Sequence, residues 1–423
     1  MIGLGVGILS TATLSLLSFL SVAAQSPAGR PNQYIVVLRD GNDPTAVAQE
    51  HANAHALSVG FVYKHALKGY AARIPEGRLS ALARDPRVLF ISEDRPVKVT
   101  GQTLPTGVDR IQGDLSSTKS GNGAGTVNVP VAIIDTGIDI RHRDLNVAGG
   151  TNCSAGGTSY DDGNGHGTHV AGTVAAKDNG AGVVGVASGT PLYAVRVLDD
   201  TGSGTWSSVI CGIDWVSANA ANYGIKVVNM SLGGGGSDDK NCGYTNGDVL
   251  HQAICKSVEK GLTYVVSAGN NAQNFANSVP AAYNEVLTVT AIADHNGQSG
   301  GGASPTCMAD SDDTAASFSN FTTIGSDDET HTIAAPGTCI YSTWKGRSYN
   351  TISGTSMAAP HITGTVALCI NSGACSGLTP NQIITKLRSD AAAQPTNYGF
   401  TYFSNSPNDT TRYYGSLGYA GGY

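Results

Sequence analysis

The sequence is poor in charge, in basic surface and in long apolar runs. Charged residues make up 13% of 423, and the formal net charge is −7. The chain therefore has no basic field to hold a phosphate backbone, which excludes a nucleic-acid partner. After residue 29 no run reaches the roughly 18 apolar residues that a membrane-spanning helix needs. With 40% hydrophobic residues the chain is also not a disordered polyampholyte.

The first 29 residues contain no charged side chain. Residues 14–24 form an apolar run that ends in Val22, Ala23 and Ala24, small residues of the kind that signal peptidase cleaves after. We interpret residues 1–24 as a signal peptide, so the mature protein is expected to be secreted and free of the membrane. A retained membrane anchor is the alternative.

Cysteine is absent from the first 150 residues. All eight cysteines follow, an even number in a chain predicted to be exported, and this predicts disulfide bonds. Zinc sites of the common kind are not expected, because no C-x-x-C pair is present. Proximity in sequence alone suggests pairing Cys242 with Cys255 and Cys369 with Cys375.

Two parts of the chain carry opposite charge. Residues 30–100 hold 10 basic and 7 acidic residues, a balance of +3, whereas residues 101–423 hold 15 and 25, a balance of −10. In the first part, we predict strands at 33–40 and 88–93, a hairpin around 63 and 69–74, and helices after Asp43 and at 76–84. This β-α-β-β-α-β order predicts a small ferredoxin-like α+β domain over residues 30–99. Two prolines predict a linker over 96–107.

The second part, residues 101–423, alternates buried strands with helices. Apolar, β-branched runs predict strands at 129–134, 192–197, 227–230, 263–266 and 286–291. Amphipathic or apolar stretches predict helices at 166–176, 207–221, 248–260, 356–370 and 380–389. This alternation predicts an α/β domain with a parallel sheet covered by helices on both faces. The tail from Gln394 is expected to be surface loop with one last strand.

Three polar residues stand at the ends of these elements. Asp135 closes an apolar strand, His166 opens a helix within Gly-His-Gly-Thr-His, and Ser356 opens another within Gly-Thr-Ser-Met-Ala. Each residue alone is typical of a turn or a helix cap. Together they supply the hydroxyl, the imidazole and the carboxylate that nucleophilic serine catalysis requires.

The order Asp, His, Ser and the residues around each resemble the subtilisin-like serine proteases. The chain is similar to subtilases of the proteinase K type over about residues 101–415, and its first part resembles their inhibitory propeptide. The resemblance implies that Ser356 attacks the scissile carbonyl, that His166 acts as base and then acid, and that Asp135 orients the imidazole. It also implies that the oxyanion is held by the backbone N–H of Ser356 and the side-chain amide of Asn270.

The resemblance further implies that a polypeptide substrate pairs with main chain. One flanking segment contains Ser203, Gly204 and Thr205, and the other contains Ser231, Leu232 and Gly233. Ala268 and Gly269 would complete the walls of the first subsite together with the second segment. These walls contain no acidic residue, so we expect broad specificity with an apolar or aromatic residue before the cut bond.

In this family the propeptide inhibits the enzyme until it is cut off, which here implies self-processing near Thr100 or Gly101 and a monomeric mature enzyme. The resemblance implies no cofactor for the chemistry and calcium as a structural ion. Its ligands are unknown: residues 310–313 and 327–329 are acidic candidates, and Thr332 or a neighbour stands where relatives have one calcium-binding Asp.

Three alternatives are weighed against this interpretation. An α/β-hydrolase esterase would need G-x-S-x-G with Asp and then His after the serine, and this order is absent. A metalloenzyme could use His166 and His169, but H-E-x-x-H is missing. A catalytically inactive subtilase acting as a binding protein is the remaining alternative.

Overall fold

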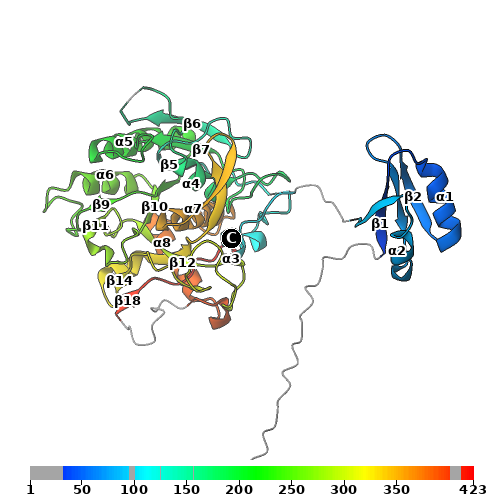
Figure 1. Ribbon diagram of the computed structural model, residues 1–423. Helices are drawn as coiled ribbons and strands as arrows, with labels where there is room; N and C mark the ends of the chain where they lie inside the picture. Colours follow the sequence, from blue (N-terminus) through cyan, green and yellow to red (C-terminus); the bar gives the residue numbers. More distant parts are fainter. Residues whose placement is uncertain (1–31, 95–100, 124, 156, 401–410) are drawn as a thin grey trace, which may run out of the picture. The chain divides into compact units, whose positions relative to one another are not determined.

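The computed structural model describes residues 32–423 except 95–100, 124, 156 and 401–410. It divides into two compact units, Met1–Val99 and Thr100–Tyr423, which are described separately (Figure 1). The predicted signal peptide lies outside the described residues. Within the described part of the chain, no helix combines the length and the apolar character required to cross a membrane.

The smaller unit is a four-stranded antiparallel sheet with two helices. Its strands run in the order β2 (Ser58–Tyr63), β3 (Gly69–Arg73), β1 (Gln33–Leu38) and β4 (Val88–Glu93), with α1 (Pro44–His55) and α2 (Glu76–Leu82). Asp43 caps α1 by accepting a hydrogen bond from the Thr45 N–H at 3.0 Å. Val36, Val47 and Leu82 pack in the core. The predicted β-α-β-β-α-β order is confirmed.

The larger unit is built on an eight-stranded sheet. Its strand order is β13 (Thr314–Ala315), β12 (Leu287–Ala293), β10 (Thr263–Ser267), β8 (Val227–Met230), β5 (Val131–Asp135), β7 (Leu192–Arg196) and β6 (Val147–Asn152), and β15 (Thr332–Pro336) also pairs with β12. All pairings are parallel except that of β13. The carboxyl ends of the parallel strands therefore share one edge, where α/β sheets gather their sites.

Helices cover both faces of this sheet. Along β5, Ile133 packs into one hydrophobic cluster and Ile134 into the other, because successive side chains of a strand point to opposite faces. The Ile133 cluster contains residues of α4 (His166–Ala175), α7 (Thr355–Asn371) and α8 (Pro380–Ala392). The Ile134 cluster contains residues of α5 (Trp206–Tyr223) and α6 (Val249–Val258). The predicted fold class is confirmed.

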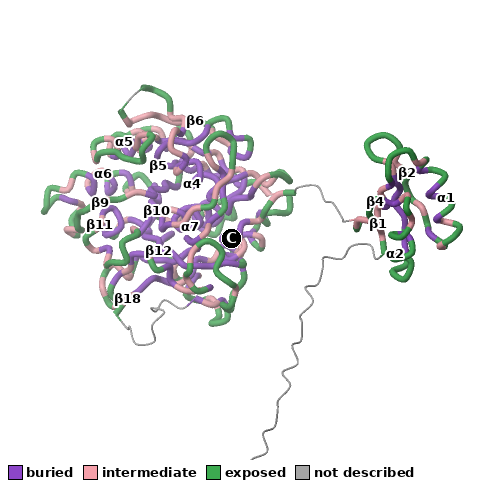
Figure 2. Tube along the Cα trace, in the orientation of Figure 1, coloured by how far each residue is buried: buried purple, intermediate pink, exposed green. Residues whose placement is uncertain are grey.

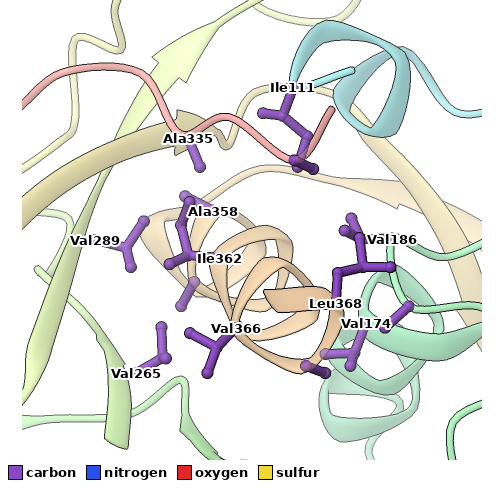
Figure 3. Packing of buried hydrophobic residues seen from close by; sticks show 14 of the residues in the cluster. Ile111, Val174, Val186, Val265, Val289, Ala335, Ala358, Ile362, Val366 and Leu368 are labelled. Carbon is purple, nitrogen blue, oxygen red and sulfur yellow. The ribbon is translucent and has the colours of Figure 1, made fainter. Parts of the chain in front are cut away.

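Helix α7 lies inside the larger unit rather than on its surface. Figure 3 shows Ala358, Ile362 and Val366 packed against Val265 and Val289 of the sheet. Its residues from Met357 to Cys369 are all buried, so this helix is enclosed by protein on all sides rather than facing solvent with one polar face. Figure 2 shows this buried interior, with exposure concentrated in the outer loops.

Some elements differ from the sequence-based expectation. Helix α3 (Thr106–Arg110) begins inside the predicted linker, with Val108 buried. The end of the tail is not surface loop, because Tyr414, Leu417 and Tyr423 are buried in the main core. Residues 401–410 of the tail lie outside the described residues. Several short strands were not predicted, namely β9 (Gly234–Gly235), β11 (Ser278–Val279), β14 (Thr322–Thr323), β16 (Ile340–Trp344) and β17 (Ser348–Ile352). The short 3₁₀ helices were not predicted either; they lie at Gly113–Leu115, Phe275–Asn277, Asp327–His331 and Thr396–Tyr398. The expected last strand is β18 (Arg412–Tyr413).

All eight cysteines form disulfides. The two pairs assigned by proximity, Cys242–Cys255 and Cys369–Cys375, are both present. The other two bonds, Cys153–Cys211 and Cys307–Cys339, join residues too far apart in sequence to be paired by proximity.

Candidate active site

Asp135 and His166 meet at the carboxyl edge of the sheet. Asp135 is the last residue of β5 and is fully buried, and His166 is the first residue of α4. The Nδ1 atom of His166 lies 2.8 Å from Oδ1 and 3.0 Å from Oδ2 of Asp135. Since an ionised carboxylate only accepts hydrogen bonds, Nδ1 carries the proton and Nε2 is left as the free base.

This pair is held in place by Asp162, which sequence reasoning missed. The carboxylate of Asp162 accepts the N–H of Gly165 at 2.8 Å and the hydroxyl of Thr168 at 2.6 Å, so it organises the start of α4. Its Oδ1 also accepts the hydroxyl of Thr136 at 2.9 Å. Gly167 has no room for a side chain, because an added Cβ would lie 2.2 Å from the Gly137 carbonyl oxygen.

The electrostatics of the pair favour a basic imidazole. Burial opposes protonation of His166, but the charge and hydrogen bond of Asp135, aided by the charge of Asp162, outweigh it and raise the pKa of His166 above its ordinary value. His169, one helical turn away, differs: burial lowers its pKa to about 3, and its Nε2 donates to the Ile340 carbonyl at 2.9 Å. His169 is therefore a neutral core residue, which argues against a metal site shared with His166.

Ser356 lies in the first turn of α7, partly exposed. Its Oγ donates to the carbonyl of Ser231 at 3.3 Å, and among the described contacts it makes no hydrogen bond to His166. In return the Ser231 hydroxyl donates to the Ser356 carbonyl at 2.9 Å. Pro360 explains this bond, because it lacks the N–H that would otherwise bond the carbonyl four residues earlier.

Asn270 follows β10 beside the start of α7. Its Oδ1 accepts the N–H of Thr355 at 2.8 Å and the Thr355 hydroxyl at 2.9 Å. The Thr355 hydroxyl in turn accepts the N–H of Gly269 at 3.0 Å. These bonds assign the side-chain orientation of Asn270 and leave its Nδ2 group free to donate elsewhere. Thr355 is thus a positioning residue that sequence reasoning did not single out.

The loop that carries Asn270 rests on buried Asn320. The Oδ1 atom of Asn320 accepts the N–H groups of Asn271 at 2.9 Å and Gln273 at 3.1 Å. Its Nδ2 donates to the Ala268 carbonyl at 2.9 Å. One amide therefore supports three backbone groups of the loop, through contacts 47 to 52 residues apart in sequence.

An open cleft of about 870 Å³ lies beside His166. Its lining includes the predicted substrate-binding residues Ser203, Gly204, Thr205, Ser231, Leu232 and Gly233. Ala268 and Gly269 are not part of this lining, and Ala268 is buried. Gly202 and Gly234, which adjoin the two predicted segments, also line it. So do residues that were not predicted to bind substrate, namely Thr136, Asn164, Leu198, Thr201, Trp206 and Val209.

Several carboxylates of the two acidic candidate loops bind groups of the protein itself. Asp312 accepts the N–H groups of His295 and Ala303, and Asp313 binds Arg110 at 2.7 Å. In the second loop Asp327 is paired with Lys240. Calcium requires six to eight oxygen ligands, and these contacts do not by themselves assign a set of ligands to calcium. Thr332, buried in β15, donates its hydroxyl to the Asp328 carbonyl.

The chain matches two known protein families and several characterised relatives. Residues 126–413 match the subtilase family, and residues 33–100 match the peptidase inhibitor I9 family. Subtilisin DY of Bacillus licheniformis is 38% identical over 305 residues, which cover 71% of this chain and 95% of that protein. Subtilisin J of Geobacillus stearothermophilus is 34% identical over 362 residues, 84% of each chain.

A solved structure agrees with these relatives. A cold-adapted subtilisin-like serine proteinase superposes with a TM-score of 0.53 at 30% identity, covering 74% of this chain and 98% of that one. The family match, the relatives and the fold agree on the larger unit, and the smaller unit matches the inhibitor family. The chain thus belongs to the subtilase family of serine endopeptidases and carries an I9 inhibitor domain ahead of its catalytic domain.

Proposed function

We propose that this subtilase is a secreted, broadly specific endopeptidase that matures itself, with Asp135, His166 and Ser356 as its catalytic triad. The observation that carries the proposal is the hydrogen bond between His166 Nδ1 and buried Asp135 at the edge of an open cleft. It fixes the tautomer in which Nε2 is the base, and that is the state a serine hydroxyl needs in order to lose its proton.

Proton transfer follows from this arrangement. On substrate binding the Ser356 hydroxyl turns from the Ser231 carbonyl toward His166 Nε2, a rearrangement consistent with the long 3.3 Å bond it makes in the free enzyme. His166 takes the proton as Oγ attacks the carbonyl carbon, and Asp135 stabilises the imidazolium. The same proton is then given to the leaving amine, and water repeats the sequence on the acyl-enzyme.

The tetrahedral oxyanion is stabilised by two donors. One is the backbone N–H of Ser356 at the start of α7, where the helix dipole favours negative charge. The other is Asn270 Nδ2, whose orientation is fixed by Thr355 through Oδ1. Donors preorganised in this way need no rearrangement as charge develops, which is why each is worth about 2.7–4 kcal/mol.

The cleft supports recognition of an extended peptide through its main chain. Gly204 and Gly233 allow close approach of another backbone, and such pairing tolerates many sequences. Leu232 and Trp206 supply apolar surface, and no acidic residue lines the cleft, which supports a preference for apolar or aromatic residues before the cut bond.

We further propose that the I9 domain is the enzyme's intramolecular inhibitor and that the mature enzyme is a secreted monomer that requires no cofactor for its chemistry. The match of residues 33–100 to the inhibitor family supports the first part. The four disulfides support the second, because such bonds persist in oxidising compartments.

The experiment is to express wild type and Ser356→Ala identically and to measure intact mass and N-terminus. Wild type should lose the signal peptide and then about 75 further residues, the stretch between the predicted signal peptide and the predicted cut near Thr100. Ser356→Ala should keep those residues. Ser372→Ala, at the other end of α7, is the matched control and should mature normally. If wild type stays full length, an inactive binding protein replaces this proposal; if Ser356→Ala is processed in a protease-deficient host, Ser356 is not the nucleophile.

A further inference from the structure

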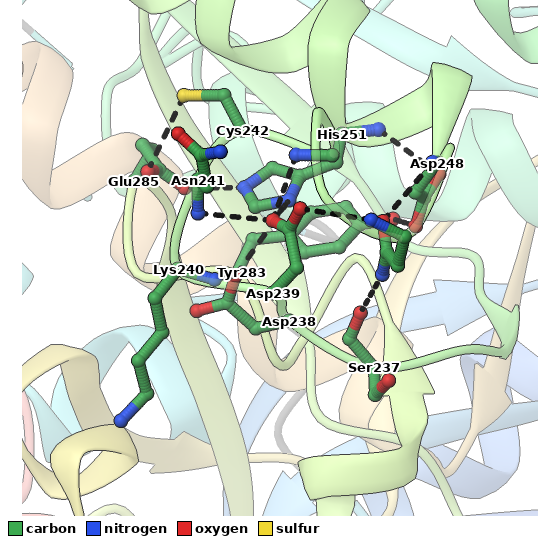
Figure 4. A network of polar contacts seen from close by, with 12 residues as sticks. Ser237, Asp238, Asp239, Lys240, Asn241, Cys242, Asp248, His251, Tyr283 and Glu285 are labelled. Atoms are coloured by element: carbon green, nitrogen blue, oxygen red, sulfur yellow. Dashed lines mark hydrogen bonds and ion pairs between the residues drawn. The ribbon is translucent and has the colours of Figure 1, made fainter.

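A polar cluster outside the active site has no role in the reaction described above. It consists of Asp238, Asp239, His251 and Glu285, drawn in Figure 4, and we call it the His251 cluster. Asp238 and Asp239 belong to the loop between β9 and α6, His251 lies in the first turn of α6, and Glu285 precedes β12. Three carboxylates therefore surround one imidazole.

The imidazole of His251 is fully buried and only half satisfied. Its Nε2 lies 2.9 Å from Glu285 Oε2, a normal hydrogen bond, and since the carboxylate only accepts, Nε2 carries the proton. Its Nδ1 is buried and has no hydrogen-bond partner. A buried lone pair without a partner is costly, so this atom requires an explanation.

The carboxylates near Nδ1 are too far away for hydrogen bonds. Asp239 Oδ1 lies 3.4 Å and Asp238 Oδ1 3.6 Å from Nδ1, beyond the ordinary range for a nitrogen donor. The three atoms lie within 4.8 Å of one another. Ligands held at about 2.0–2.2 Å from a tetrahedral zinc ion are separated by about 3.3 Å. The two distances from Nδ1 are therefore compatible with three ligands around one ion.

We propose that the His251 cluster binds a divalent transition-metal cation of the zinc class, through His251 Nδ1, Asp238 and Asp239. Glu285 is then the outer carboxylate that receives the second N–H of the ligating histidine, the arrangement that metal-bound histidines ordinarily adopt. An imidazole nitrogen among the ligands favours zinc over calcium or magnesium, which prefer oxygen alone. The fourth position is left for water.

Charge supports a cation at this place. With neutral His251, the cluster carries three negative charges, and the nearby Lys240 is paired with Asp327 instead. A divalent ion would offset most of this charge. The side chain of Asp238 is 9% exposed, so an ion can reach the cluster from solvent beside it.

The ligands are also held rigidly before any ion binds. Asp239 accepts the N–H groups of Gly243 at 2.8 Å and Thr245 at 2.7 Å, and the Cys242–Cys255 disulfide ties the same loop to α6. The ring of His251 stacks on that of Tyr283, with centroids 4.0 Å apart. Because Cys242 and Cys255 are bonded to each other, their sulfurs are not ligands.

The competing explanation is an imidazolium without metal. Burial opposes a charge on His251, but Glu285, Asp238 and Asp239 together raise its pKa, and Asp248 beside Tyr283 adds negative charge nearby. Even if Nδ1 were protonated, its distances to Asp238 and Asp239 would be longer than those of an ordinary hydrogen bond. The two explanations predict opposite responses to added metal, so one titration separates them.

The test uses the mature enzyme, blocked at its serine with a sulfonyl fluoride to prevent autolysis and dialysed against EDTA. Titration with Zn²⁺ alone should give one bound equivalent by calorimetry and raise the melting temperature, whereas Mg²⁺ should do neither. Glu285→Gln should weaken Zn²⁺ binding about 10- to 100-fold, as loss of an outer carboxylate does. Asp238→Asn, at the rim of the cluster, should also weaken it.

His331→Gln is the matched control. His331 is another buried histidine with an unpartnered Nε2. Among the described residues its one ion-pair contact is to Asp328, at 3.7 Å, so it has fewer close carboxylates than His251. This variant should keep the full Zn²⁺ stoichiometry, and His251→Gln should lose it. No Zn²⁺ binding by wild type, or undiminished binding by both His251→Gln and Asp238→Asn, overturns the proposal. The wild-type titration needs no variant to fold, and it measures metal binding rather than peptide hydrolysis.

Discussion

Ser231 and Ser356 exchange hydrogen bonds, each hydroxyl donating to the other residue's carbonyl. The bond from Ser231 compensates for Pro360, which cannot donate to the Ser356 carbonyl. Ser231 therefore links the wall of the cleft to the first turn of the helix that carries the proposed nucleophile. A residue assigned to substrate binding from the sequence thus also has a structural role.

Ser231→Ala should lower both stability and kcat, because it removes the donor that the partly buried Ser356 carbonyl has in place of Pro360. Such a loss costs about 1–3 kcal/mol. Pro360→Ala added to it restores an N–H four residues after Ser356 and should recover part of the loss. Melting temperature of the inhibitor-blocked enzyme and kcat report the two effects. Additive effects of the two substitutions would contradict this link.

Asp135→Asn should reduce kcat/KM by about 10⁴, since the imidazole loses the partner that fixes its tautomer. In wild type, kcat/KM falls as pH drops through the pKa of His166, because the protonated ring accepts no proton. Asp135 raises that pKa, so its removal should move the acid limb to lower pH. The measurement is a pH–rate profile of both enzymes. An acid limb that stays in place would mean that His166 is not the titrating base.

Asn270→Ala should lower kcat about 10²- to 10³-fold and leave KM nearly unchanged, because the lost donor acts on the oxyanion rather than on the bound substrate. Asn271→Ala is the matched control, since Asn271 is the exposed neighbour. Steady-state kinetics on one peptide substrate suffices. A rise in KM at constant kcat would assign Asn270 to substrate binding instead.

Asp294→Asn should increase stability at pH 8 more than at pH 5. Burial raises the pKa of Asp294 to about 7, so the folded protein holds this proton more tightly than the unfolded chain does. The free energy of unfolding therefore falls as pH rises from about 4 to about 7, by up to about 1.4 kcal/mol per pH unit, and the amide removes this dependence.

The measurement is denaturant unfolding of the inhibitor-blocked Asp294→Asn enzyme and of wild type at pH 5 and pH 8. Asp214→Asn, on the exposed face of α5, is the control and should show no such difference. An equal effect of Asp294→Asn at both pH values would show that Asp294 is ionised throughout, held by Arg110 3.9 Å away.

The sequence was most informative where local pattern decides structure. A continuous apolar run such as that of β5 can be recognised as a strand in the sequence, because both faces of a buried parallel strand are covered. Strand β15 was missed because Thr332–Pro336 is short and ends in proline, and it becomes a strand only by pairing with β12. The tail was predicted to be exposed because Tyr, Gly and Asn are loop formers, yet Tyr414 and Leu417 fill the core.

The same distinction applies to the site. Asp135, His166 and Ser356 stand in short motifs, which is why the sequence suggests them as the triad proposed above. The supporting residues Asp162, Thr355 and Asn320 act through hydrogen bonds to parts of the chain that folding brings next to them. A local sequence pattern does not show which parts these are. Asp162 is the partial exception, since it lies within four residues of His166 and caps the same helix.

The burial of α7 on all sides has a consequence for timing. The proposed nucleophile is fixed to a helix that has no stable position until the sheet, α4 and the C-terminal segment have closed around it. A chain still being assembled therefore lacks a competent serine, even when the rest of its active-site residues have formed. We therefore expect proteolytic activity to appear only after the catalytic domain has packed around α7.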